Sequence, residues 1–260
     1  MQLLVTRPQP QADEWVAALR AQQVNAQALP LIAIAAEGDA AVAAAWAALD
    51  AKRLLVFVSP NAVSTFFARR PRASAWPAQL QAACTGPGTA RALRDAGVPA
   101  AQIVAPANDA TQFDSEALWQ RLVAQPWAGE RVLVVRGDGG RDWLAERLRE
   151  RGADVQFVQA YRRMAPTLDG AAREQLQRAL DAPAQHVWLF SSSQAVDHLR
   201  LLAPHAAWSA AHAWATHPRI ADTLRAAAFG HVQAVSPTLD AVVAAWRASI
   251  QSAAASDQRP

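Results

Sequence analysis

The sequence predicts an α/β protein with two similar parallel-sheet domains joined by a two-stranded hinge, the second domain being inserted into the first. Three observations predict this architecture. Short apolar runs alternate with longer amphipathic segments, stretches of sequence recur at similar offsets, and the recurring stretches are interleaved rather than placed end to end. Strict alternation of strands and helices is typical of parallel sheets that carry helices on both faces.

The repeat is clearest in three strand–loop–helix segments. The matched segments are 56–63 with 189–196, 85–93 with 216–224, and 4–7 with 133–136, at offsets of 133, 131 and 129 positions. Similar offsets for three such units indicate two like domains, and the alternation within each is flavodoxin-like. Two α/β domains of this kind are expected to enclose a cleft in which a ligand could bind.

Each predicted element follows from a local pattern of apolar residues. The expected strands are 3–6, 26–29, 54–58, 82–85, 102–104, 131–135, 154–159, 187–190, 213–216 and 232–235. The expected helices are 12–22, 61–69, 89–96, 115–124, 141–151, 171–180, 194–202, 219–227 and 239–250. In the helix 141–151, for example, Leu144 and Leu148 are four residues apart and the charged residues fall on the other side.

The interleaved repeat sets the domain boundaries. We expect a discontinuous first domain over residues 1–33 and 165–250, and an inserted domain over residues 36–160. The two connecting segments, near 31–37 and 160–166, are expected to run side by side as the hinge. The last ten residues, 251–260, are small and polar and are expected to form a disordered tail.

Composition narrows the function classes. Hydrophobic residues make up 52% of the chain, but the longest apolar stretch, 40–49, is too short to span a bilayer, so we expect no membrane association. One cysteine, Cys84, excludes an internal disulfide, and nothing points away from the cytoplasm. The net charge of +3 comes from dispersed residues without a basic run, so we expect no nucleic-acid partner.

Polar residues follow most of the predicted strands. In open parallel sheets, ligands bind beyond the carboxyl ends of the strands, and the helices that start there present free backbone N–H groups. The segments concerned are 6–8, 59–61, 85–89, 136–141, 191–194 and 216–218. Several such helix N-termini could bind a ligand with several anionic groups. The alternative is that Ser59, Ser191 and Thr216 only cap their helices.

Familiar catalytic motifs do not fit. The segment 137–142 starts like a dinucleotide-binding loop, but Asp142 stands where the third glycine belongs. The six histidines show no metal-ligand spacing on one helix, and no P-loop or nucleophile elbow is present, so we expect neither metal nor organic cofactor. Tyr161 is the sole tyrosine and lies at the domain junction. Its phenol could act as a general acid or could simply pack in the hinge.

Several segments together resemble the uroporphyrinogen-III synthase family. They are 3–8, 30–32, 134–141, 152–155 and 161–163, and the Arg-Gly-Asp-Gly-Gly-Arg loop followed by Tyr161-Arg162 is the most specific combination. The resemblance covers residues 1 to about 250. It implies two α/β domains and an enzyme of heme biosynthesis, a lyase that closes hydroxymethylbilane to uroporphyrinogen III with inversion of ring D and loss of water.

The resemblance also implies roles for individual residues. Tyr161 matches the tyrosine thought to assist loss of the hydroxyl group as a catalytic acid. The positions that match substrate-binding loops are Arg7, Ser59, Asn61, Thr85, Gly86, Thr89, Arg136, Gly137, Ser191, Ser192 and Thr216. The segment 216–218 departs from the family pattern, because a glycine loop like that of 85–89 would make a cleaner anion site.

Two functions are therefore weighed. The first is the synthase, in which a cytoplasmic monomer without cofactor folds the linear tetrapyrrole so that its ends meet. The second is a two-domain protein that binds a small polyanionic ligand without catalysis. The Arg-Gly-Asp-Gly-Gly-Arg loop with Tyr161 favours the synthase.

Overall fold

Contacts within a computed structural model divide the chain into two units, which we call the discontinuous unit and the inserted unit. The discontinuous unit comprises Met1–Ala33 and Met164–Pro260, and the inserted unit comprises Ile34–Arg163. The structure describes residues 1–72, 74–107, 110 and 112–256. The two units are described separately below.

The discontinuous unit is built on a five-stranded sheet with the order β11-β10-β9-β1-β2, and all its neighbouring strands are parallel. Its strands are β1 (Gln2–Val5), β2 (Ala26–Ala28), β9 (His186–Phe190), β10 (His212–Ala215) and β11 (His231–Ala234). Its helices are α1 (Gln11–Ala21), α7 (Gly170–Asp181), α8 (Ser193–Leu202), α9 (Pro218–Ala226) and α10 (Leu239–Ser256), with a short 3-10 turn at Pro183–Gln185.

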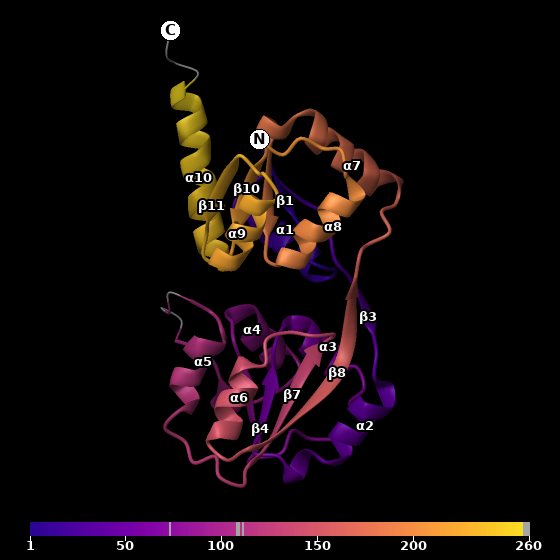
Figure 1. Ribbon diagram of the computed structural model, residues 1–260, viewed down its shortest axis with the longest axis vertical. Coiled ribbons are helices and arrows are strands. Elements are labelled where there is room, and N and C mark those ends of the chain that lie inside the picture. Colours follow the sequence, from indigo (N-terminus) through magenta and orange to yellow (C-terminus); the bar gives the residue numbers. More distant parts are fainter. Residues whose placement is uncertain (73, 108–109, 111, 257–260) are drawn as a thin grey trace. The chain divides into compact units, whose positions relative to one another are not determined.

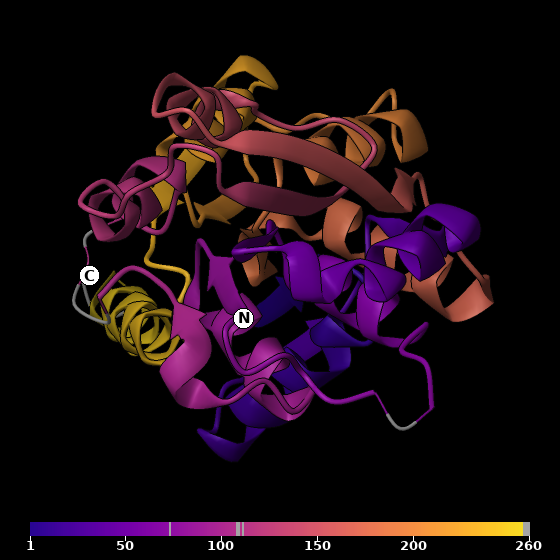
Figure 2. The ribbon, with the colours of Figure 1, turned by 90° about the horizontal axis from the view of Figure 1, so that it is seen from below.

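Both faces of this sheet are covered by helices (Figures 1 and 2). Leu3, Val5 and Trp214 face a buried cluster with α1 and α10. In β9, Trp188 stands between Val187 and Leu189, which belong to the same cluster, so its side chain faces the opposite side of the sheet. There its ring lies edge-on to the Trp208 ring, with the ring centres 6.2 Å apart. The alternation is a consequence of the two-residue period of a strand.

The inserted unit is built on a six-stranded sheet with the order β3-β8-β7-β4-β5-β6. Its strands are β3 (Ala33–Ala36), β4 (Leu54–Phe57), β5 (Gln81–Cys84), β6 (Ile103–Val104), β7 (Arg131–Gly137) and β8 (Asp154–Met164). Its helices are α2 (Asp39–Ala47), α3 (Pro60–Phe67), α4 (Pro87–Asp95), α5 (Ser115–Leu122) and α6 (Trp143–Glu150), with 3-10 turns at Leu49–Ala51 and Ala100–Gln102.

Two buried clusters lie on opposite faces of this second sheet. Leu55 and Phe57 of β4 face the helices α2, α3 and α4. Leu54 and Val56, which alternate with them, face α5 and α6. Helices on both faces require strands that are apolar on both sides, which explains the uninterrupted apolar run of β4.

The α/β class with two parallel sheets is confirmed. The chain passes between the units within β3 and near the end of β8, and these two strands are neighbours in the sheet. Strand β8 is eleven residues long and continues five residues beyond the strand predicted to end at residue 159. Helix α2 was not among the predicted helices, because its alanine-rich sequence shows little amphipathic contrast.

The expected disordered tail is wrong over residues 251–256. Helix α10 continues to Ser256. The segment includes three consecutive alanines, and alanine has the highest intrinsic helix propensity, which offsets the absence of large apolar side chains. Residues 257–260 of the expected tail lie outside the described residues.

Candidate active site

The centre of the candidate site in the inserted unit is a pair of hydroxyl groups. Tyr161 of β8 is 2% exposed, and its hydroxyl oxygen lies 2.8 Å from Ser59 Oγ. Ser59 is the N-cap of α3, and its Oγ accepts a hydrogen bond from the Ala62 N–H at 3.2 Å. Ser59 is therefore both a helix cap and the hydrogen-bond partner of the phenol.

Gly137 makes room for the Tyr161 ring. It is the last residue of β7 and pairs with Tyr161 across a register shift between β7 and β8. A Cβ atom built on Gly137 would lie 2.7 Å from Tyr161 Cε2, a distance that no side chain tolerates without movement. Glycine is needed here for close approach of the ring to the backbone.

The loop that follows β7 is held by two acidic residues. Arg136 forms an ion pair with Asp142, and its guanidinium lies 3.9 Å from the centre of the Phe157 ring. Asp138 accepts a hydrogen bond from the Arg163 N–H at 3.0 Å. The Asp138 contact ties this loop to the segment around Tyr161. The ion pair with Asp142 balances the charge of Arg136 within the unit.

The loop after β5 lies beside the loop after β4. A Cβ atom on Gly88 would be 3.8 Å from Pro60 Cγ, which places the starts of α3 and α4 next to each other. Thr89 is 4% exposed, whereas Thr85 and Gly86 are partly exposed. Burial raises the pKa of the nearby Cys84 thiol to about 11, so this cysteine is protonated at neutral pH and is a poor nucleophile.

The discontinuous unit carries its own set of predicted site residues. Thr6 donates a hydrogen bond from Oγ1 to the Leu189 carbonyl at 2.8 Å, which joins the carboxyl ends of β1 and β9. Ser192 is the N-cap of α8 but its side chain makes no capping hydrogen bond. The next residue, Ser193, accepts a hydrogen bond from Thr223 of α9 at 3.0 Å, and the Thr216 N–H donates to Phe190 O.

Arg7 differs from Arg136 in having no acidic partner among the residues that the structure describes. Its guanidinium lies 4.2 Å from the centre of the Trp15 ring. Its Nε atom is buried and has no hydrogen-bond partner among the described residues, although the side chain as a whole is partly exposed. Burial lowers the pKa of this guanidinium to about 10, and it is still charged at neutral pH.

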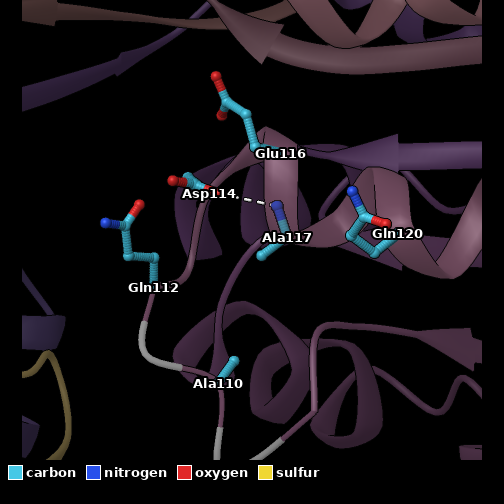
Figure 3. A pocket seen from close by; sticks show the side chains of 6 residues that line it. All are labelled: Ala110, Gln112, Asp114, Glu116, Ala117 and Gln120. Atoms are coloured by element: carbon cyan, nitrogen blue, oxygen red, sulfur yellow. Dashed lines mark hydrogen bonds between the residues drawn. The ribbon is translucent and has the colours of Figure 1, made fainter.

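Two pockets lie away from all of these residues. Figure 3 shows the first, at the start of α5, where the Ala117 N–H donates to the N-cap residue Asp114 at 2.9 Å. The second lies between α7 and the segment 202–211 in the discontinuous unit. Neither is lined by a predicted site residue.

The described residues contain no group of three or more His, Cys, Asp or Glu side chains that could hold a metal ion. Over the same residues, none of the helices has both the length and the hydropathy needed to cross a bilayer.

The structure brings some predicted site residues together and separates others. Tyr161 is in contact with both Ser59 and Gly137, and Asn61 lies in the first turn of α3. Thr85, Gly86 and Thr89 belong to the adjacent loop, whereas Arg7, Ser191, Ser192 and Thr216 belong to the other unit.

The sequence patterns did not indicate that Asp142 pairs with Arg136 or that Asp138 pairs with Arg163. In the sequence, Asp142 stands out only because it breaks a dinucleotide-binding pattern. An acidic residue six positions after an arginine, across a glycine loop, was the available signal.

The fold and the site define a class of protein with two α/β units. In each unit, polar loops connect the carboxyl ends of parallel strands to the helices that follow, and the inserted unit also holds a buried tyrosine. Residues 13–244 match the family model described as uroporphyrinogen-III synthase HemD. The chain therefore belongs to the uroporphyrinogen-III synthase family.

Curated relatives agree with this assignment. The uroporphyrinogen-III synthase of Escherichia coli is 33% identical over 224 residues, which is 85% of this chain and 86% of the relative. That of Salmonella typhimurium is 37% identical over 173 residues, which is 66% of this chain and 68% of the relative.

Solved structures show the same fold. A uroporphyrinogen III synthase from Thermus thermophilus superimposes with a TM-score of 0.58 at 18% identity, covering 97% of this chain and 99% of the other. The enzyme from Helicobacter pylori gives a TM-score of 0.57 at 15% identity, covering 96% and 99%.

Proposed function

We propose that this chain cyclises hydroxymethylbilane to uroporphyrinogen III, with inversion of ring D and loss of water, as a step of tetrapyrrole and heme biosynthesis. Membership of the uroporphyrinogen-III synthase family, over residues 13–244, carries this proposal. The substrate has eight carboxylates, which fits the helix N-termini at the carboxyl ends of both sheets.

Tyr161 is the proposed general acid. The reaction begins with loss of the hydroxyl group on ring A. The Tyr161 O–H bond breaks as its proton passes to the departing hydroxyl oxygen, the carbon–oxygen bond breaks, and water, a protonated azafulvene and the Tyr161 phenolate result. Ring D then attacks through its substituted carbon, and the resulting spiro intermediate fragments and closes again with ring D inverted. Ring D loses the proton of its free α-carbon on this final closure, and a proton returns to the phenolate, so only water is lost overall.

Ser59 is proposed to stabilise the phenolate that remains. Its Oγ already accepts the Ala62 N–H, so its own proton is free to be donated to the Tyr161 oxygen across the 2.8 Å contact. Hydrogen bonds to a charged oxygen are about twice as strong as those to a neutral one. This contact therefore strengthens as the proton leaves Tyr161, which is the requirement for lowering the barrier.

The remaining polar residues are proposed to bind the substrate. They are Arg7, Asn61, Thr85, Gly86, Thr89, Gly137, Ser191, Ser192 and Thr216. Arg136, which the sequence also offers as a substrate-binding residue, is paired with Asp142 and is proposed to hold its loop. Bringing the two ends of a flexible chain together can contribute about 7–11 kcal/mol at best, more than one proton donor supplies. We also propose that the protein acts as a cytoplasmic monomer without a cofactor, since one chain carries both sets of loops. Light scattering of the purified protein tests the monomer.

A coupled assay tests the function. Hydroxymethylbilane is generated in situ, the protein is added, and the oxidised products are separated by chromatography. Predominant isomer III supports the proposal. Isomer I alone, at the rate without protein, contradicts it and favours a polyanion-binding protein without catalysis.

A double-mutant cycle tests the roles of the hydroxyl pair. Tyr161→Phe is expected to slow turnover by about 10²–10⁴-fold at most, with an unchanged melting temperature. Ser59→Ala should slow turnover less, and the double variant should be no slower than Tyr161→Phe alone, because Ser59 acts through the phenol. Additive effects would show that Ser59 acts independently, and unchanged kinetics of Tyr161→Phe would remove Tyr161 from the mechanism.

A further inference from the structure

Arg7 stands at the point of the discontinuous unit where the sheet changes direction. Strand β1 leads through α1 to β2 on one side, and β9 leads through α8 to β10 on the other. In open α/β sheets the crevice at such a switch point, outside the carboxyl ends of the strands, is where ligands bind. Arg7 is the second residue after β1, and Ser191 and Ser192 are the first two residues after β9, so all three lie at this switch point.

The surroundings of Arg7 shield its charge without balancing it. No ion pair or hydrogen bond of its side chain occurs among the described residues, and its Nε atom is buried. The one strong contact is with the face of the Trp15 ring at 4.2 Å. An aromatic face orients a guanidinium but leaves its N–H donors in the ring plane unsatisfied.

A cation that is partly shielded from water and has no acidic partner weakens a fold. Burial disfavours the charged form of Arg7 and lowers its pKa to about 10, with no acidic group to oppose the shift. Arg136, at the equivalent position of the inserted unit, has the partner Asp142. The charge of Arg136 is balanced within the protein, whereas the charge of Arg7 would be balanced only when an anion binds.

We propose that Arg7 forms a carboxylate-binding site at the switch point of the discontinuous unit, and that Arg136 instead holds its own loop. The ligand would be one carboxylate of the tetrapyrrole, an identification that rests on the proposed function. The site itself, as a receptor for a carboxylate, rests only on the geometry of Arg7. A planar guanidinium held over an indole presents two parallel N–H donors, which match the two oxygens of a carboxylate.

Thermal unfolding of matched variants is the first test. Arg7→Met removes the charge and keeps an unbranched side chain against Trp15, and it is expected to raise the melting temperature by about 2–4 °C. Arg136→Met is expected to lower the melting temperature, because Asp142 then loses its partner. A lower melting temperature for Arg7→Met would show that Arg7 has a structural role, and the proposal would be overturned.

A carboxylate probe is the second test. Citrate, compared with sodium chloride at equal ionic strength, should raise the melting temperature of the wild-type protein and of Arg136→Met by more than that of Arg7→Met. General exclusion of citrate from protein surfaces stabilises all variants alike, so the difference between variants is the readout. An equal response in all three proteins would overturn the site.

Kinetics then identify the ligand. In the coupled assay Arg7→Met should raise KM by about tenfold to a hundredfold and leave kcat nearly unchanged, since the charge-assisted contact with the carboxylate is lost. Arg7→Lys should recover part of the affinity. If the wild-type protein forms no isomer III but citrate still distinguishes Arg7→Met, the function fails and the carboxylate site stands. If isomer III forms and KM is unchanged in Arg7→Met, the site fails and the function stands.

Discussion

The two units share one architecture but use its carboxyl edge differently. By the offsets of the sequence repeat, β2-β1-β9-β10-β11 corresponds to β8-β7-β4-β5-β6, which is the same spatial order. The registers also correspond: Val5 pairs with Leu189 in one unit, and the equivalent residues Val134 and Val56 pair in the other. The difference between the units therefore lies in side chains rather than in the backbone plan.

At the switch point the side chains diverge. In the inserted unit the Tyr161 ring packs against Gly137 and its hydroxyl group is hydrogen-bonded to Ser59, and Arg136 is paired with Asp142. In the discontinuous unit the position equivalent to Tyr161 is Ile32, which is 5% exposed, and Arg7 is paired with no acidic residue in the described part of the chain. A duplicated scaffold can thus place a proton donor in one copy and an unbalanced cation in the other. Four tests, taken from the largest expected effect to the smallest, probe this contrast.

Both units carry an aromatic cluster on the equivalent face of the sheet, but in the inserted unit Leu55 occupies the position of Trp188. Trp188 is fully buried, between Phe190 and Trp208. Trp188→Ala is expected to lower the free energy of unfolding by about 3–5 kcal/mol, measured by urea unfolding followed by circular dichroism. A loss below about 1 kcal/mol would mean that this core collapses around the gap, contrary to a tightly packed aromatic cluster.

Gly137 tests the close approach of Tyr161. Gly137→Ala places a Cβ atom 2.7 Å from Tyr161 Cε2, and it is expected to cost about 1–3 kcal/mol of stability and to reduce turnover. Gly170→Ala is the matched control, because it lies at the start of α7 with no atom within 4 Å of the new Cβ. The prediction fails if both variants unfold and turn over like the wild type.

The two N-cap serines test the contrast directly. Ser59→Ala removes the hydrogen bond from Ala62 and is expected to cost about 1 kcal/mol of stability. Ser192→Ala should cost less, because the Ser192 side chain makes no capping bond. Thermal unfolding measures both losses, and equal losses would contradict the asymmetry of the two caps.

The smallest effect concerns a pair of histidines. His212 and His231 stack at 4.2 Å, and burial, followed by the charge of His231, lowers the pKa of His212. The unfolded chain then binds a proton that the folded chain resists, so stability should fall as the pH drops below about 6.5. Gln81 stands at the equivalent position of the inserted unit.

His212→Gln, which copies that residue, should flatten the decline. Urea unfolding at a series of pH values measures the slope for both proteins. Equal slopes for the variant and the wild type would show that the pair does not control this pH dependence.

Local sequence was sufficient for most elements and for the position of the polar loops. The buried strand β4 and the helix α3 that follows it could be predicted because an apolar run ends in Ser59-Pro60, a common helix start. The extension of β8 to Met164 could not, because Arg162 and Arg163 look like loop residues and only pairing within the sheet makes the segment extended. Tyr161 was ambiguous between acid and packing residue for the same reason.

The sequence by itself determined the α/β class, the repeated order of elements and the residues that could act, because period, turn residues and repeat offsets are local properties of a chain. Only the tertiary structure decided which of these residues meet. The contact of Tyr161 with Ser59 spans 102 positions. Arg136 is paired with Asp142, whereas Arg7 is paired with no acid among the described residues, and this difference depends on which side chains the folded loops bring close together. Charge balance and hydrogen bonding act over a few ångströms in space, so they are set by packing and not by order along the chain.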